Sequence, residues 1–198
     1  MDPLAVGLFL GSATALLGSP GPGIAALLAV GRVEGLSGGL RYYAGLQLGL
    51  AAAAAVSAIG LASLLRAFPS ALRALMIIAA SYLVWLAYKI ATAPVGSALG
   101  GKPVPCSPTA GLLLGITNPK GYVAFASLLA SQTLLPRNPG GDIVLKWILI
   151  VVVILAVDFA WLLVGVALKQ AALRPRSERI LNGVLGAAVL GAAAATFR

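Results

Sequence analysis

Long apolar runs separated by short polar connections dominate this chain of 198 residues. About 20 apolar residues in helical conformation cover the roughly 30 Å of hydrocarbon in a bilayer. Six runs have this length, at about Leu4–Val30, Leu40–Leu65, Leu72–Ile90, Thr109–Leu135, Trp147–Leu168 and Ile180–Phe197. The pattern predicts an all-α integral membrane protein with about six transmembrane helices.

Two of the predicted helices, the first and the fourth, are broken by proline and glycine well inside the apolar run. The first break covers Gly18–Gly23 and the second covers Thr117–Gly121. Proline and glycine cannot continue a regular helix there, and an unpaired backbone group in hydrocarbon costs several kcal/mol. A break at this depth survives where it is buried or faces a polar cavity, so each break is a candidate binding site; a simple proline kink is the alternative.

The two breaks divide the chain into similar halves within a single transmembrane domain, 1–198. The first half is 1–92, a proline-rich linker covers 93–108, and the second half is 109–198. Each half has three predicted helices, of which the first is broken. An odd number of spans per half places the halves in opposite orientations, so we expect two inverted three-helix repeats. Eight basic residues in the odd-numbered connections against five on the other side predict that both termini lie outside.

Composition excludes several other classes of protein. Hydrophobic residues make up 60% and charged residues 10%, against about 25% charged in soluble domains. The net charge of +9 comes from basic residues that stand singly in connections, so it indicates membrane-flanking charges and no nucleic-acid partner. The absence of histidine removes histidine-based catalysis, and one cysteine, Cys106, cannot form an intramolecular disulfide. We therefore expect no enzyme, no cofactor and no resident metal.

Chemistry-bearing side chains are few. Substrate-binding candidates at and near the breaks are Ser19, Pro20, Gly21, Pro22, Gly23, Gln47, Asn118, Pro119 and Lys120. A helix restarting after Pro22 presents free N–H groups and a positive dipole end, which suit a carboxylate. Lys120 could pair with an anionic substrate group or with Asp158, or could reach the headgroups; Gln47 could bind substrate or join two helices.

Asp158 stands alone at the centre of the fifth apolar run. A carboxylate at mid-bilayer costs roughly 2.5 to 3.5 kcal/mol on insertion scales, so it should face protein or water. A carboxylate that is both buried and close to a cation can take up and release a proton in each transport cycle. Asp158 is therefore the candidate for proton coupling. The alternative role is a structural hydrogen bond to another helix.

Pairs of glycines at spacing i, i+4 indicate places where helices approach closely. Gly45 and Gly49 should let a neighbouring helix approach. Two further faces, Gly7 with Gly11 and Gly111 with Gly115, fit either a homodimer or packing within one chain.

These motifs resemble the LysE/RhtB family of amino-acid exporters, in particular its homoserine/threonine-type members. The matching segments, in the family's order, are Ser19–Gly23, Ala44–Gly49, Ala80–Leu86, Thr117–Lys120 and Val157–Asp158, with the spacing of Asn182 and Gly186. The chain departs from the family at Gly23, where members often have a polar residue, and at Ser131–Thr133, where many have Pro-Gln-Phe. The resemblance implies proton-driven export of amino acids or related small metabolites across the cytoplasmic membrane of a prokaryote. It also implies functional roles for the matching Pro20–Pro22 and Asn118–Lys120.

Other function classes fit less well. A metal-cation transporter of related architecture is the nearest alternative, although hard cations prefer several oxygen ligands and one buried carboxylate supplies few. A membrane aspartyl protease needs two carboxylates at mid-depth, and only Asp158 qualifies. The sequence therefore predicts a multi-pass secondary transporter that works by alternating access. That it moves a small amino-acid-like substrate against protons is what the family resemblance implies.

Overall fold

A computed structural model describes residues 3–19, 21–60 and 107–170, with isolated positions between 77 and 92 and between 176 and 187. Within these residues every regular element is a helix, and there is no strand. The helices are α1 (Pro3–Gly18), α2 (Pro22–Ala58), α5 (Pro108–Thr117), α6 (Pro119–Leu129) and α7 (Pro139–Gln170). The prediction of an all-α chain is confirmed here. The third and sixth predicted spans and the linker 93–108 lie almost entirely outside the described residues.

Each of the five described helices begins at a proline. Proline suits the first helical position because the N–H that it lacks would have no partner within the helix. Two of these starts carry a side-chain cap: Ser107 accepts a hydrogen bond from the Ala110 N–H at 3.1 Å, and Asn138 accepts one from the Gly141 N–H at 2.9 Å. A polar residue followed directly by a proline thus sets where these two helices start.

The helix α2 is two antiparallel segments joined at Gly35, where φ is 74° and ψ is −160°. A positive φ of this kind favours glycine. A Cβ on Gly31 would lie 2.7 Å from the Leu162 carbonyl oxygen and a Cβ on Gly39 would lie 2.5 Å from the Leu162 Cδ1, so both segments meet the same residue of α7. The sequence predicted a connection between Val30 and Leu40; the structure corrects this, because the chain turns at one glycine.

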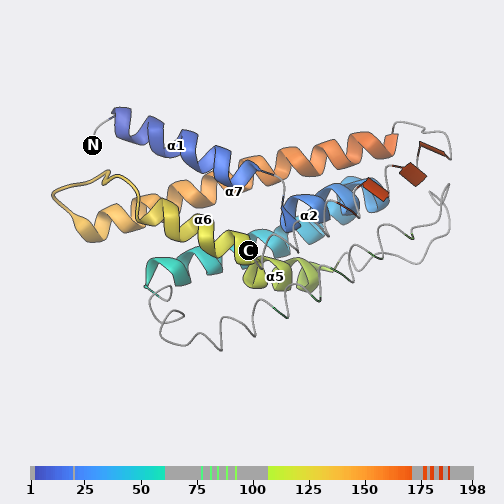
Figure 1. Cartoon of the computed structure of the whole chain (residues 1–198), viewed down its shortest axis with the longest axis horizontal. Coiled ribbons are helices and arrows are strands. Elements are labelled where there is room, and N and C mark those ends of the chain that lie inside the picture. The colour runs from blue at the N-terminus through green and yellow to red at the C-terminus, as the bar shows by residue number, and fades with distance from the viewer. Residues whose placement is uncertain are drawn as a thin grey trace.

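The helix α2 lies at the centre of the described helices and contacts α5, α6 and α7, while α1 contacts α6 and α7 (Figure 1). Its second segment crosses α5 at very short distance. A Cβ on Gly45 would lie 1.8 Å from the Pro108 carbonyl oxygen, and one on Gly111 would lie 2.2 Å from the Tyr42 carbonyl oxygen. A Cβ on Gly49 would lie 2.4 Å from the Leu112 carbonyl oxygen, and one on Gly115 would lie 2.6 Å from the Leu46 carbonyl oxygen. The expected close approach at Gly45 and Gly49 is confirmed, and the partner is the face of Gly111 and Gly115.

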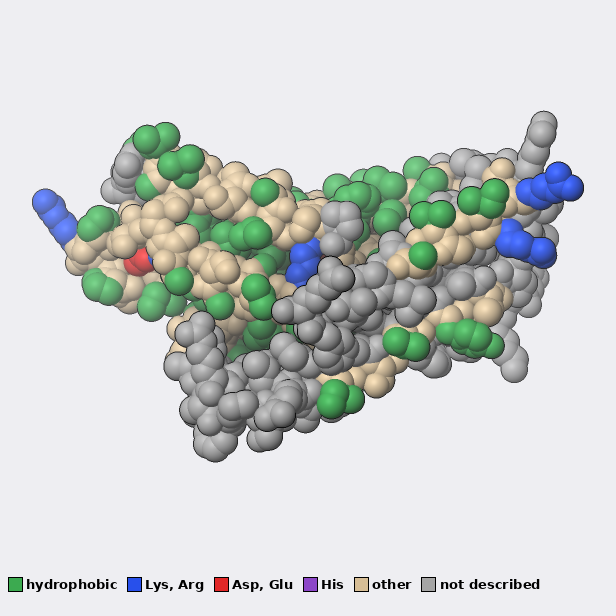
Figure 2. Space-filling model, viewed as in Figure 1, with side chains coloured by type: hydrophobic (Ala, Val, Ile, Leu, Met, Phe, Trp, Pro, Cys, Tyr) green, Lys and Arg blue, Asp and Glu red, His purple; other side chains and the backbone are tan. Residues whose placement is uncertain are grey.

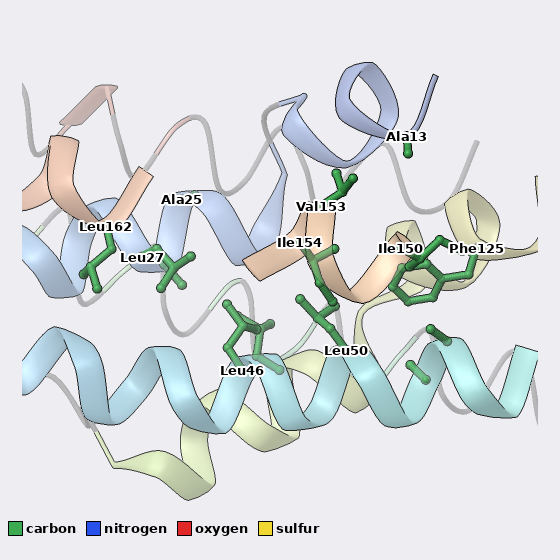
Figure 3. Packing of buried hydrophobic residues seen from close by; sticks show 14 of the residues in the cluster. Ala13, Ala25, Leu27, Leu46, Leu50, Phe125, Ile150, Val153, Ile154 and Leu162 are labelled. Carbon is green, nitrogen blue, oxygen red and sulfur yellow. The ribbon is translucent and has the colours of Figure 1, made fainter. Parts of the chain in front are cut away.

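Apolar side chains fill the space between the helices. Leu50 of α2 and Ile154 of α7 point toward one another in the close view (Figure 3) and are 6% and 3% exposed. Phe125 of α6 lies in the same cluster. This core holds α6 and α7 against the second segment of α2, and so fixes the position of the residues described below.

The outer surface is also apolar, which is unusual for a protein in water. Exposed apolar residues recur every three or four positions on one side of α7, namely Val144, Ile148, Val152, Leu155, Phe159 and Leu163. By length and composition α2 and α7 are both candidate membrane spans, and since α2 turns at Gly35, residues 36–58 are its part long enough to cross. Figure 2 shows hydrophobic side chains along the visible face and most of the Lys and Arg side chains at its two ends. A lipid environment accounts for this distribution.

The fourth and fifth predicted spans have different boundaries in the structure. The helix α6 ends at Leu129, whereas the sequence predicted helix to Leu135, and α7 begins at Pro139, whereas the prediction began at Trp147. A buried ion pair lies at the segment that joins the two helices. Asp142 accepts hydrogen bonds from the N–H groups of Leu134 and Leu135, at 2.5 and 2.7 Å, and thereby fixes a non-helical segment ahead of α7.

Lys146 completes this structure from one turn further along α7. Its ammonium lies 2.9 Å from Asp142 and donates to the carbonyl of Leu129 at 3.1 Å, at the end of α6. Both side chains are nearly inaccessible to solvent, so the ion pair is buried between the helices. The i, i+4 spacing of Asp142 and Lys146 is visible in the sequence but was not singled out there.

Replacing Lys146 with methionine is expected to lower the free energy of unfolding by about 3 kcal/mol, because it leaves the buried Asp142 carboxylate without its cation. Thermal or denaturant unfolding in detergent measures the loss. The double variant Asp142→Asn, Lys146→Met should recover part of the stability, since neither charge is then left unpaired. A double variant less stable than Lys146→Met would contradict this account.

Candidate functional site

The first break lies between Gly18, where α1 ends, and Pro22, where α2 begins. Two backbone carbonyls at the C-terminal end of α1 accept hydrogen bonds from side chains of other helices. Trp161 of α7 donates from Nε1 to the Gly18 carbonyl at 3.3 Å, and Lys120 of α6 donates from Nζ to the Ser19 carbonyl. The break is therefore held by donors from two other helices, as a break at membrane depth requires.

The second break is a single residue, Asn118, between α5 and α6. Its backbone is extended, with φ −72° and ψ 103°, and its carbonyl accepts from the Gly121 N–H at 3.0 Å. The Asn118 side chain is 6% exposed, and its Oδ1 atom has no hydrogen-bond partner within the described part of the chain. Ser107 and Asn138 occupy the same position ahead of a proline and do cap their helices. The Asn118 side chain does not cap α6, so its Oδ1 atom remains available to accept a hydrogen bond from a ligand.

The two breaks lie side by side, although about 100 residues separate them in the sequence. A Cβ on Gly21 would lie 2.7 Å from the Lys120 Cδ, and a Cβ on Gly23 would lie 3.7 Å from the Asn118 Nδ2. A small cavity of about 40 Å³ opens where they meet. It is lined by Leu17, Gly21, Pro22, Gly23, Ile24, Leu50, Asn118, Lys120, Gly121, Ala124, Phe125, Ile154 and Asp158.

Asp158 brings a carboxylate to the same cavity from the middle of α7. It is 5% exposed, and its Oδ2 accepts a hydrogen bond of 2.8 Å from the Nε2 of Gln47. The Lys120 ammonium is the cation that acts on it electrostatically. The cavity therefore has a positive side, made by Lys120 and the N-terminal ends of α2 and α6, and a negative side at Asp158.

The structure places most of the residues singled out in the sequence at this cavity. Gly21, Pro22, Gly23, Asn118, Lys120 and Asp158 line it. Ser19 contributes its carbonyl, while its hydroxyl donates to the Leu16 carbonyl at 2.8 Å. Pro119 is buried as the first residue of α6 and is not among the lining residues. Gln47 contacts Asp158 and also does not line the cavity, and Pro20 lies outside the described residues.

Sequence reasoning missed Trp161 and the apolar wall of the cavity. Trp161 stands three residues after Asp158 in an apolar run, where no sequence pattern distinguishes a tryptophan with a polar role. Its hydrogen bond to the Gly18 carbonyl is visible only in the structure. Leu50, Phe125 and Ile154 look like ordinary core residues in the sequence, and they are also the wall of the cavity.

Gly21→Ala is expected to impair any function of Lys120 while leaving the fold intact. Gly21 has extended backbone angles that alanine adopts readily, but its Cβ would displace the flexible Lys120 side chain. Gly11→Ala is the control, since it lies outside the cavity and its Cβ would meet no atom of the described residues within 4 Å. Ligand binding or transport by the purified variants, with their melting temperatures, measures the difference. Equal loss in both variants would contradict a specific role of the Lys120 position.

Two broken helices that meet at a charged, buried cavity in a lipid-adapted helical protein define a membrane transporter. The family comparison agrees: residues 14–197 match the model of the LysE type translocator family, and the chain belongs to this family. No curated protein and no solved structure matches the chain.

Proposed function

We propose that this transporter exports amino acids or related small metabolites in exchange for protons. The observation that carries the proposal is the cavity at the two breaks, where Lys120 and Asp158 supply opposite charges within one buried space. An α-amino acid carries a carboxylate and an ammonium on one carbon. The carboxylate would lie at the helix ends near Gly21 and Lys120, and the ammonium near Asp158.

The proposed architecture is two inverted three-helix halves that rock about this cavity. In support, α1 with the first segment of α2 forms one broken helix, and α5 with α6 forms the other. Residues 36–58 form the next helix of the first half and cover about 34 Å at 1.5 Å per residue, enough for the hydrocarbon core. The cavity lies between the two broken helices, which is where a site that opens alternately to each side is expected.

Proton coupling is assigned to Asp158. It is the acidic residue among those that line the cavity. When Asp158 is ionised it can hold a substrate ammonium, and when it is protonated this attraction disappears. The two ligands would then exclude one another at a single carboxylate, which is the requirement for exchange transport.

A metal cation is the alternative cargo. Within the described residues no group of three or more His, Cys, Asp or Glu side chains is placed to hold a metal ion. The Lys120 ammonium at the cavity would also repel a divalent cation. These observations favour an organic zwitterion.

The membrane of residence is proposed to be the cytoplasmic membrane of a prokaryote. A homodimer stays a prediction. The face of Gly111 and Gly115 is used within the chain. By contrast, a Cβ added to Gly7 or Gly11 would meet no atom of the described residues within 4 Å, so this face of α1 offers room for such a contact.

Efflux from proteoliposomes tests the proposal. Vesicles loaded with a panel of labelled amino acids, or with Mn²⁺ as a divalent probe, are diluted into buffer that sets an inward proton gradient. We expect gradient-dependent loss of one or more amino acids and retention of Mn²⁺. Efflux of Mn²⁺ alone would favour the cation transporter, and loss of neither cargo above that of protein-free vesicles would contradict the proposed export.

A further inference from the structure

The amide of Gln47 faces Asp158 across the contact between α2 and α7, and only one of its two polar atoms has a hydrogen-bond partner among the described residues. Its Nε2 donates to the Asp158 Oδ2 at 2.8 Å. Its Oε1 is buried and has no hydrogen-bond partner within the described residues. Gln47 itself is 7% exposed, so water at the surface does not satisfy this oxygen. A buried acceptor without a donor costs about 1–3 kcal/mol and calls for an explanation.

The explanation lies in the two states of the carboxyl group. An ionised carboxylate only accepts hydrogen bonds, so it can use the Nε2 of Gln47 but has nothing to offer the Oε1. A protonated carboxyl group has an O–H donor as well as an acceptor oxygen. A primary amide and a carboxylic acid are both planar, and they can pair edge to edge through two hydrogen bonds, one in each direction.

We propose that Gln47 is a positioning residue that recognises the protonated form of Asp158. The proton taken up from solution stays covalently bound to the Asp158 Oδ1, and that O–H donates to the Gln47 Oε1, while the Nε2–Oδ2 hydrogen bond persists. Gln47 remains neutral throughout. Release of the proton breaks one hydrogen bond and leaves the Oε1 without a partner again. This inference rests on the proposed role of Asp158 in proton coupling.

Other groups around Asp158 do not offer the same pairing. From α6 it faces the Lys120 ammonium, which only donates hydrogen bonds. From α2 it faces Tyr43 as well as Gln47. The Tyr43 hydroxyl already donates to the Leu155 carbonyl at 2.8 Å. Among the described residues α1 and α5 contribute no charged side chain to this neighbourhood.

The proposal gives the two protonation states different helix contacts. With Asp158 protonated, α2 and α7 are joined at this point by two hydrogen bonds; with Asp158 ionised, they are joined by one, and the carboxylate is available to a cation in the cavity. Protonation would thus tighten the contact between a helix of the first half and a helix of the second.

Infrared difference spectroscopy between neutral and acidic pH tests the pairing directly in the purified full-length protein. The carboxylic C=O band of Asp158 is identified by its loss in Asp158→Asn. We expect this band to move to higher frequency in Gln47→Met, which removes donor and acceptor at similar side-chain length, because a carbonyl stretches at higher frequency when its hydrogen bonds are lost. Tyr43→Phe is the control, since it removes a hydrogen bond to α7 one turn away and does not touch the carboxyl group.

An unchanged band position in Gln47→Met would overturn the proposal, as would an equal shift in Tyr43→Phe, which would indicate altered helix packing. If Gln47→Met does not fold, wild-type protein with ¹³C-labelled glutamine supplies the test: a glutamine amide band must shift on acidification, and must not shift in Asp158→Asn. These readouts need no transport, so a protein that exports no amino acid would contradict the proposed function and still decide the pairing.

Discussion

Replacement of Asp158 by asparagine is expected to abolish efflux driven by a proton gradient, to the background of protein-free vesicles. Asparagine has nearly the same size and can still pair with the Gln47 amide, but it cannot bind or release a proton. The chain should therefore fold with the cavity intact and lose the exchange of substrate against protons. Initial rates of efflux of a labelled amino acid, with an imposed pH gradient, measure the loss.

Two controls separate coupling from folding. The melting temperature of Asp158→Asn in detergent should match the wild type closely, because an uncharged residue at this depth is less costly than a carboxylate. Asp158→Glu keeps a carboxyl group and should retain part of the gradient-driven rate. Undiminished proton-driven efflux by Asp158→Asn would remove Asp158 from the coupling mechanism.

Gly45→Leu is expected to prevent recovery of folded protein. A Cβ on Gly45 would lie 1.8 Å from the Pro108 carbonyl oxygen and 2.6 Å from its carbon, both of which are backbone atoms that cannot rotate away. Leucine adds three further carbons at the same contact. Since α2 follows the first break and α5 precedes the second, forcing them apart would also separate the two breaks. Yield of monodisperse protein on size exclusion, with circular dichroism of what remains, measures the effect.

Gly7→Leu is the matched control, because it makes the same change on α1 where no atom of the described residues lies within 4 Å of the added Cβ. It should be recovered in wild-type yield. Folded Gly45→Leu protein with a wild-type melting temperature would show that the two helices can pack at a larger distance than the structure gives.

The breaks, the carboxylate and the close helix crossing could all be predicted from the sequence, because each is a departure from a uniform apolar pattern. Proline and glycine inside a run, one Asp in a run, and glycines four apart are local signals with a direct physical meaning. The contact between Gly21 and Lys120 could be expected only by comparing the two broken helices with one another, because no local sequence pattern shows which distant residues touch.

Helix ends were predicted less well, for reasons that particular residues show. The turn at Gly35 falls inside the predicted connection between Val30 and Leu40, but the sequence did not show that the turn takes one residue, because one glycine among several gives no distinct signal. The start of α7 was placed eight residues late because Asn138 and Pro139 were taken as part of a polar connection, when together they form a helix start. The end of α6 depends on the contact of Lys146 with the Leu129 carbonyl, which apolar periodicity cannot predict.

The contact of Lys120 with the Ser19 carbonyl has a consequence for affinity. The ammonium is tethered beside that carbonyl, so it is present there at a high effective concentration whatever the composition of the cell. A substrate carboxylate, which the proposed function places at Lys120, must compete with the Ser19 carbonyl for this ammonium. The apparent dissociation constant of the substrate is then the intrinsic constant divided by the fraction of time that Lys120 is away from the carbonyl. Such a built-in competitor would leave the cavity mostly empty at low substrate concentration and would confine turnover to conditions of surplus.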